Sequence, residues 1–237
     1  MGGGGIILNH VMLGQGQDII FLHGWGGSID SFRGVGEYFS ANYRCALVDF
    51  YGFGKSALPG VLTLDDYAKG IEEIIAEYSM KDVILVGHSF GGRVAMLLAS
   101  RNSNIKSIVL VDSAGLKPRF SIKKFCKKVA YRLKKALKMD VSKCGSEDYR
   151  KLSGDMRETF KNIVNFHLDY CLKDIKCSTL IIWGKKDKDT PPYMARRLRK
   201  RIYNSGLIIL KGGHYSYIDC YGQFLAILKS YFGDICK

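Results

Sequence analysis

Short apolar runs alternate with longer amphipathic stretches along most of the chain. The runs are rich in Ile, Val and Leu, and their length is typical of buried strands. The runs that we expect to form strands are residues 6–13, 18–22, 44–49, 83–86, 105–112, 179–183 and 207–210. The stretches with helical spacing are residues 28–39, 63–78, 93–99, 191–203 and 223–232. This alternation predicts a mostly parallel sheet with helices on both faces.

The alternation stops in the middle of the chain. Residues 116–177 contain no strand-like run, and their spacing indicates helices. The pattern of strands resumes at about position 178. We therefore expect a helical insertion within an α/β core that is formed by residues 1–115 and 178–237.

One expected strand passes directly into a helix through the sequence Gly87-His88-Ser89-Phe90-Gly91. The pattern G-x-S-x-G between a buried strand and a helix is a nucleophile elbow. Its sharp turn holds the Ser89 hydroxyl clear of the sheet, and the flanking glycines let the strand and the helix approach closely. The helix begins just behind Ser89, so its free N–H groups face any negative charge that develops there. Ser89 is therefore the candidate nucleophile, and it needs a base within hydrogen-bond reach.

With this elbow and further motifs, the chain resembles the α/β-hydrolase fold family along nearly its whole length. The further motifs are His23-Gly-Trp-Gly, Asp49-Phe-Tyr-Gly-Phe-Gly-Lys-Ser56 and Gly184-Lys-Lys-Asp-Lys-Asp-Thr-Pro191. The resemblance implies a mostly parallel eight-stranded sheet with helices on both faces and a helical cap inserted after the sixth strand. Residues 116–177 would form that cap.

The resemblance also implies a Ser–His–Asp triad, in which the acid and then the histidine follow the serine along the chain. His214 lies on a Gly-rich loop just past the last expected strand, which is the family's position for the base. Asp187 matches the family's acid, which would hold the imidazole tautomer and stabilise the imidazolium. Asp112 and Asp189 are the alternatives for the acid, because some members of the family place it where Asp112 lies. Thr190 is expected to cap the helix that follows.

The same resemblance assigns the oxyanion hole to two backbone amides. They are the N–H groups of Trp25 and of Phe90, the residue after the nucleophile. The glycines on both sides of Trp25 let its loop bend toward the site. His23 is expected to brace this loop rather than to take part in the chemistry, and Asp49 to accept hydrogen bonds from the backbone.

The composition indicates the size of the domain and the cellular compartment of the protein. A length of 237 residues, 47% of them hydrophobic, suits one domain with a full-sized core. The seven cysteines form no C-x-x-C pair, and such an odd, unpatterned set is typical of a reducing compartment. The sequence shows neither a signal-peptide pattern nor an apolar run of about 18 residues. We therefore expect a cytoplasmic protein.

Most of the net charge of +14 lies in the expected cap. Residues 116–176 carry 17 Lys and Arg against 7 Asp and Glu, which gives +10. Lysines there alternate with apolar residues at helical spacing, which are Ile122, Phe125, Val129, Leu133 and Leu137. Such a basic amphipathic helix can pack over the site, attract an acidic substrate or carrier, or dock on an anionic membrane. The chain has no recognisable nucleic-acid-binding module, so no nucleic acid is expected as a partner.

The activity that the resemblance implies is hydrolysis of a small-molecule carboxylic ester through an acyl-enzyme, as in a serine carboxylesterase. It implies no metal and no cofactor. An esterase acting on an acyl group carried by an acidic carrier protein is an alternative, because H-G-W-G is similar to the motif of pimeloyl–acyl carrier protein methyl esterases. A triad-based lyase and a non-catalytic binding protein are alternatives of other classes, since the fold alone does not decide the activity.

Overall fold

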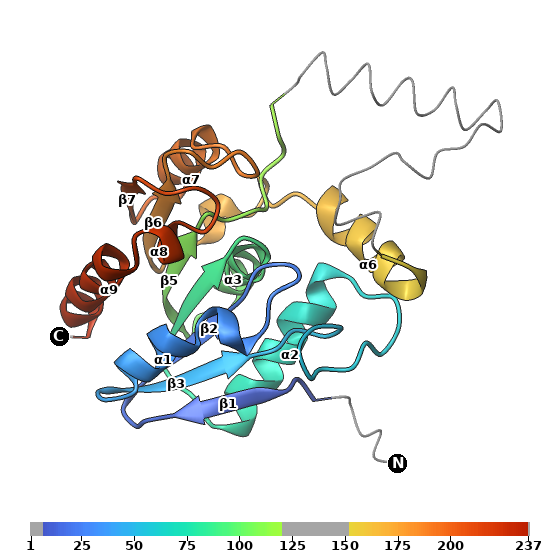
Figure 1. Ribbon diagram of the computed structural model, residues 1–237, viewed down its shortest axis with the longest axis horizontal. Helices are drawn as coiled ribbons and strands as arrows, with labels where there is room; N and C mark the ends of the chain where they lie inside the picture. The colour runs from blue at the N-terminus through green and yellow to red at the C-terminus, as the bar shows by residue number, and fades with distance from the viewer. Residues whose placement is uncertain (1–6, 120–151, 237) are drawn as a thin grey trace.

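A twisted seven-stranded sheet forms the centre of the structure, a computed structural model that describes residues 7–119 and 152–236 (Figure 1). The strand order is β1-β3-β2-β4-β5-β6-β7. The strands are β1 (His10–Leu13), β2 (Gln17–Leu22), β3 (Tyr43–Val48), β4 (Val83–His88), β5 (Ile105–Val111), β6 (Ser178–Gly184) and β7 (Ser205–Leu210). All neighbouring strands pair in parallel except β1, which runs antiparallel to β3.

The expected mostly parallel sheet is confirmed, but the expected count of eight strands is wrong for the described residues. Only one antiparallel strand, β1, precedes β2 there, and the chain between β2 and β3 forms short helices instead of a strand. The insertion therefore follows the fifth strand, β5, and not the sixth. The strands that carry the site keep the order that the apolar pattern predicts.

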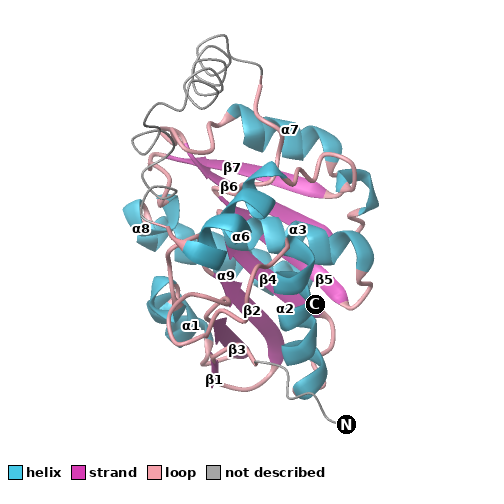
Figure 2. Ribbon diagram, turned by 90° about the vertical axis from the view of Figure 1, so that its right-hand side faces the viewer, coloured by secondary structure: helices cyan, strands magenta, loops and turns pink. Residues whose placement is uncertain are grey.

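Helices cover both faces of the sheet (Figure 2). The parallel strands are apolar on both faces, and every residue of β4 is buried. One core lies between the sheet and α2, α3 and α7, and a second core lies between the sheet and α1 and α9. The helices are η1 (Ile29–Ser31), α1 (Arg33–Phe39), α2 (Leu64–Glu77), α3 (Phe90–Arg101), α6 (Gly154–Asn165), η2 (Leu172–Asp174), α7 (Tyr193–Arg201), α8 (Ser216–Asp219) and α9 (Tyr221–Ile235).

Local capping decides where two of the helices begin. Thr63 and Asp66 form a capping box at the start of α2, in which the Thr63 N–H donates to the Asp66 carboxylate at 2.7 Å. A second capping box at Ser28 starts the 3₁₀ turn η1, so the helix expected over residues 28–39 is split into η1 and α1. The helix expected from position 93 begins earlier, at Phe90. Its N-terminus therefore lies directly behind Ser89.

Of the expected cap, the described residues include α6 and η2. α6 binds the loop before α2, since the Thr159 hydroxyl accepts from the Leu62 N–H at 2.9 Å and the Asn162 side chain donates to the Leu62 carbonyl at 3.1 Å. The division into core and cap stays a prediction, and the expected basic amphipathic helix lies outside the described residues. Within the described ranges, no helix is long and apolar enough to cross a membrane.

Candidate active site

Ser89 occupies the turn between β4 and α3 in a conformation that is rare for a residue with a side chain. Its φ is 48° and its ψ is −103°. The turn is held on both sides, because Ser89 donates its N–H to the Val111 carbonyl and accepts the Ala114 N–H, both at 3.0 Å. A Cβ on Gly87 would lie 2.5 Å from the backbone of Gly91. The elbow therefore depends on its glycines for the close approach of strand and helix.

The Ser89 hydroxyl begins a chain of hydrogen bonds. Its Oγ lies 3.1 Å from Nε2 of His214, and Nδ1 of His214 lies 2.9 Å from Oδ2 of Asp187. Burial lowers the pKa of His214, but the hydrogen bond and charge of Asp187 outweigh it, so this pKa lies above its ordinary value. Burial raises the pKa of Asp187, but hydrogen bonds from His214 and Thr190 outweigh it, so this pKa lies below its ordinary value. His214 therefore holds one proton toward a carboxylate and can accept another from Ser89.

The Asp187 carboxylate is fully buried and tightly held. Oδ1 accepts from the N–H groups of Asp189 and Thr190 at 2.8 and 2.9 Å, and Oδ2 lies 2.6 Å from the Thr190 hydroxyl. The alternative acid Asp189 is exposed, and it is bonded to Asp187 through its backbone N–H. The expected capping role of Thr190 is wrong: α7 begins after Pro192 with no side-chain cap. Thr190 instead positions the acid, a role that its spacing to Asp187 alone does not reveal.

Asp112, the other alternative acid, holds two loops of the site together. Its Oδ1 accepts from the Gly184 N–H at 2.7 Å, and its Oδ2 accepts from the N–H and hydroxyl of Ser216 at 3.0 and 2.6 Å. In the described structure it makes no hydrogen bond to His214. Burial raises the pKa of Asp112 to about 6. Asp112 thus fixes the His214 loop against the loop after β6.

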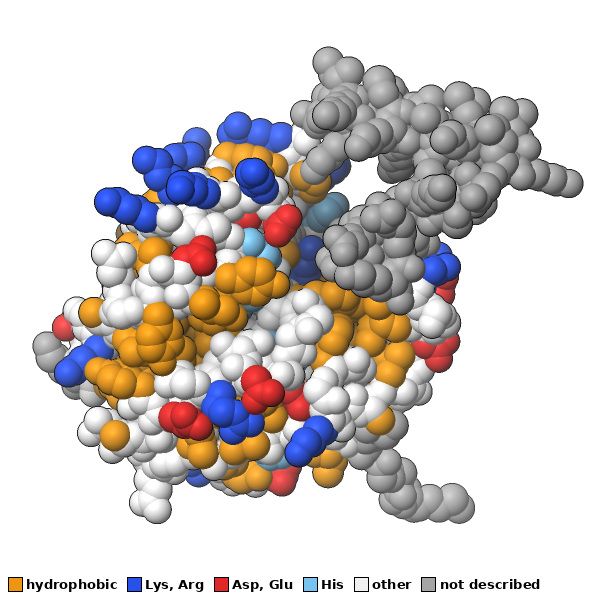
Figure 3. Space-filling view, viewed as in Figure 1, with side chains coloured by type: hydrophobic (Ala, Val, Ile, Leu, Met, Phe, Trp, Pro, Cys, Tyr) orange, Lys and Arg blue, Asp and Glu red, His pale blue; other side chains and the backbone are white. Residues whose placement is uncertain are grey.

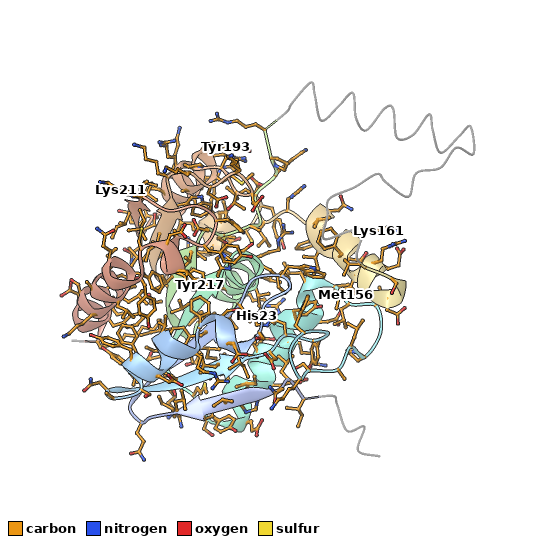
Figure 4. The ribbon with its side chains drawn as sticks, viewed as in Figure 1. His23, Met156, Lys161, Tyr193, Lys211 and Tyr217 are labelled. Carbon is orange, nitrogen blue, oxygen red and sulfur yellow. The ribbon has the colours of Figure 1, made fainter. Side chains whose placement is uncertain are left out.

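Two further histidines brace the backbone around the site. Nε2 of His88 donates to the carbonyl of His214 at 2.8 Å, and burial lowers the pKa of His88 to about 3, so the ring is neutral. His23, labelled in Figure 4, donates from Nδ1 to the Gly24 carbonyl at 2.7 Å and accepts at Nε2 from the Phe50 N–H at 3.1 Å. His23 therefore braces its loop, as the sequence predicts.

The residues of the predicted oxyanion hole lie beside Ser89. Trp25 and Phe90 line the same cavity as Ser89. Phe90 is the first residue of α3, so its N–H has no acceptor within the helix. The Trp25 loop runs close to the nucleophile, because a Cβ on Gly24 would lie 2.7 Å from Nδ1 of His88 and 3.4 Å from Cβ of Ser89. The close packing again requires glycine.

A cavity of about 370 Å³ opens beside Ser89 and His214. Its size is within the usual range of small-molecule sites, about 300–1,000 Å³. One wall is aromatic, with the Trp25 ring packed edge-on against the rings of Phe90 and Phe160 at centroid distances of 5.4 and 5.0 Å. Other residues from α6 that line it are Ile163 and Val164. The cavity is thus apolar on the side of α6 and polar at the triad.

Asp187, Asp189 and His214 also form the one group in the described ranges with the geometry to hold a metal ion. Their ligand atoms lie within 4.8 Å of one another. However, Nδ1 of His214 already binds Asp187, and both carboxylate oxygens of Asp187 already accept hydrogen bonds. The contact between Asp187 and His214 therefore suits acid–base chemistry better than metal binding.

Comparisons with known proteins agree with this geometry. Residues 19–162 match the family model described as alpha/beta hydrolase fold. The AB hydrolase superfamily protein YisY of Bacillus subtilis is 26% identical and aligns over 87% of this chain and 88% of its own length. The 2-hydroxy-6-oxo-6-(2'-aminophenyl)hexa-2,4-dienoic acid hydrolase of Metapseudomonas resinovorans is 26% identical over 91% of this chain and 84% of its own. Among solved structures, an esterase from Exiguobacterium antarcticum shares the fold with a TM-score of 0.77, at 24% identity over 94% of each chain.

Proposed function

The chain belongs to the α/β-hydrolase fold family, and on that premise we propose that it is a serine hydrolase that cleaves carboxylic esters through an acyl-enzyme. One observation carries the proposal. Ser89, His214 and Asp187 are linked by contacts of 3.1 and 2.9 Å beside a cavity that can hold a small substrate. In this arrangement the base is oriented by the acid and reaches the nucleophile.

In the first half-reaction, Ser89 Oγ attacks the ester carbonyl while Nε2 of His214 takes its proton. The carbonyl oxygen becomes an oxyanion, which the N–H groups of Trp25 and Phe90 stabilise. Asp187 stabilises the imidazolium that forms. The C–O bond then breaks, and the imidazolium protonates the departing alcohol, which leaves the acyl group on Ser89.

In the second half-reaction, water replaces the alcohol. Nε2 of His214 takes a proton from the water, whose oxygen attacks the acyl carbonyl. The second oxyanion uses the same two amides. The bond to Ser89 Oγ then breaks, Oγ regains its proton from His214, and the free acid leaves. No atom or electron is required beyond the ester and one water molecule.

The basic charge on the surface supports a second candidate function, an esterase whose acyl group is carried by an acidic carrier protein. Figure 3 shows Lys and Arg side chains gathered over α7, the helix that follows the acid loop. The basic residues of this helix are Arg196, Arg197, Arg199, Lys200 and Arg201. This surface would attract an acidic carrier, and an anionic membrane surface would suit the same charge. Either partner would make the reaction depend on salt.

The experiment that tests the function is hydrolysis of p-nitrophenyl esters from acetate to laurate, at low and at high salt. Ser89→Ala is the control, together with labelling of the wild type by a serine-directed phosphonate. We expect turnover that peaks at one chain length, disappears in Ser89→Ala and changes little with salt. Labelling without turnover of any ester would instead favour a carrier-bound substrate or a lyase.

A further inference from the structure

A second cavity, of about 240 Å³, adjoins the cavity beside Ser89. The residues that line both cavities are Arg93, Ala114, Val164, Asp189 and Thr190. Its remaining walls are largely apolar and come from the chain after β5 and from α7, including Leu116, Pro118, Tyr193 and Met194. Tyr193, labelled in Figure 4, begins α7. The triad thus has a side chamber, which the proposed reaction does not use.

Arg93 lies between the two cavities and is only 6% exposed. Its Nη1 donates to the main-chain carbonyls of Ile163 and Phe166, at the C-terminal end of α6, where a cation is favourable. Its Nε is buried and has no hydrogen-bond partner among the described residues. Burial lowers the pKa of Arg93 to about 10, so the guanidinium stays charged at neutral pH. Arg93 forms no ion pair with the residues that the structure describes. A buried charge without a counter-ion is costly, because the protein replaces its lost hydration only in part.

A second unpartnered donor belongs to a residue that lines the same chamber. Nδ1 of His167 is buried and lacks a hydrogen-bond partner in the described part of the chain, and the residue lines the second cavity. Burial lowers the pKa of His167, and the charge of Arg93 lowers it further. The ring is therefore neutral at pH 7 and can carry its one proton at Nδ1.

We propose that the second cavity binds a carboxylate group of the substrate, with the Arg93 guanidinium and the His167 imidazole as its ligands. This inference rests on the proposed function and names its substrate class, esters that carry a free carboxylate on the acyl chain. One buried positive charge is balanced by one carboxylate, whereas a phosphate dianion would bring excess charge. Lys188, which lines the second cavity, adds attraction. Asp189 lines both cavities and opposes it, but its side chain is exposed, so solvent screens its charge.

The position of Arg93 fixes the distance at which such a carboxylate is bound. Arg93 lies one helical turn after Ser89, and its N–H donates to the Ser89 carbonyl at 3.3 Å. The nucleophile and the guanidinium therefore belong to one rigid element, which is the best support for a precise subsite. Acyl chains of one length would place the ester at Ser89 and the carboxylate at Arg93 together.

The test compares p-nitrophenyl monoesters of succinic, glutaric and adipic acid with the same compounds methylated at the free carboxyl group. Each pair differs in one charge, so the ratio of their kcat/KM values measures recognition of the carboxylate. We expect the wild type to prefer the charged member at one chain length by about tenfold or more. Arg93→Met should lower that ratio by about 10- to 100-fold, and Arg93→Lys should lower it less.

Arg101→Met is the matched control, because Arg101 lies on the same helix and pairs with Asp65 at the surface. The ratio of kcat/KM for the charged and neutral esters should be the same in Arg101→Met as in the wild type. Arg93 also holds α6, so its loss can reduce the activity on both esters, but such damage leaves the ratio unchanged. A wild type that prefers the neutral ester at every length, or an Arg93→Met ratio equal to the wild-type ratio, overturns the proposal.

The binding step is also measured without turnover. Calorimetric titration of Ser89→Ala with the charged ester should show binding that Arg93→Met, added to the same variant, weakens by about tenfold or more. If no ester is hydrolysed and no phosphonate labels Ser89, the proposed function is wrong, and this titration still decides the carboxylate site. Equal binding of charged and neutral esters would overturn the site alone.

Discussion

The three carboxylates near His214 differ in which groups donate to them. Asp187 accepts from the His214 ring and from Thr190, Asp112 accepts from two loops, and Asp189 is exposed. Only Asp187 can orient the imidazole directly. The same geometry gives Asp112 a positioning role, since it holds Ser216, just after His214 in the chain. Substitutions of Asp187 and of Asp112 should therefore impair the protein in different ways.

Asp187→Asn should lower kcat by about 10⁴-fold with the fold retained, because the amide favours the wrong tautomer of His214. Asp112→Asn should mainly lower the melting temperature, because its NH₂ group would face the Ser216 donors. Ester turnover and thermal unfolding of both variants check this. A large loss of kcat in Asp112→Asn at unchanged stability, with little loss in Asp187→Asn, would reverse the assignment of the acid.

Thr190 offers a finer test of how the acid is held. Thr190→Val keeps the shape but removes the hydroxyl that lies 2.6 Å from Asp187, and it should reduce kcat by about tenfold. Thr190→Ser keeps the hydroxyl and is the matched control, with activity close to that of the wild type. Steady-state kinetics of the two variants decide the point, and equal activities would show that the hydroxyl has no special role in holding the acid.

The pH dependence of turnover follows from His214, which must be neutral to accept the serine proton. Asp187 raises the pKa of His214, so His214 stays protonated to a higher pH than an ordinary histidine, whose pKa is 6.5. Activity should therefore decline as pH falls through a value above 6.5. Asp187→Asn removes the cause of the raised pKa, so the residual activity of this variant should decline at a lower pH. A profile of kcat/KM against pH measures both midpoints.

The sequence makes Ser89, His214 and Asp187 candidates because they lie in motifs that resemble those of the family, and each follows shortly after an apolar strand. Their meeting needs only the rule that parallel strands end at the same edge of a sheet. Thr190 and Arg93 cannot be found in this way. Arg93 binds Ile163 and Phe166, and Thr190 lies 2.9 Å from the Asp112 carbonyl, partners that no local pattern joins.

At the scale of elements, the junction of β4 and α3 packs closely against the neighbouring strand. A Cβ on Gly91 would lie 2.1 Å from the Leu22 carbonyl, which belongs to the neighbouring strand β2. Backbone in the centre of a sheet cannot move aside to admit a methyl group. The glycine of the motif thus serves the packing of α3 on β2 as well as the turn itself.

Gly91→Ala should therefore destabilise the fold by about 3 kcal/mol or more, in the range of severe packing defects. Gly233→Ala is the matched control, because Gly233 is also helical and its Cβ would meet nothing within 4 Å. The Gly233→Ala substitution should stabilise the fold by about 0.5–1 kcal/mol. Urea unfolding of both variants measures the free energies, and equal effects would contradict the packing argument.

The strands were easier to predict than the helices. Apolar runs locate β2 to β7 within a few residues, because parallel strands buried on both faces must be apolar throughout. The helix expected over residues 28–39 is split because Ser28 caps a 3₁₀ turn first. The eighth strand is implied by the family resemblance alone, and no apolar run in the described residues corresponds to it.

At the scale of the whole molecule, the site joins two separate parts of the chain. Ser89 lies before the insertion, whereas Asp187 and His214 follow it, and β5 and β6 pair in the middle of one sheet. Neither part has a complete triad. Folding of the sheet and assembly of the triad should therefore be a single event.

In urea, loss of ester turnover should coincide with loss of the native tryptophan fluorescence. The chain has two tryptophans: Trp183 is fully buried in β6, and Trp25 lines the cavity. Trp25→Phe leaves Trp183 as the reporter of the sheet, and its unfolding midpoint should equal the midpoint at which the same variant loses activity. Inactivation at clearly lower urea would show that the site comes apart before the sheet does.

The pairing of β5 with β6 has a consequence for how such a protein can diversify. Because β5 and β6 are parallel, the chain leaves the sheet at the end of β5 and re-enters it at the opposite edge, where Ser178 pairs with Ser107. Both ends of the intervening segment are therefore fixed by one rigid sheet, and the core sets little constraint on the length between them. Evolution can replace that segment as a unit. One wall of the cavity then changes, while the strands that carry the triad keep their register. Substrate range can then evolve faster than catalytic machinery.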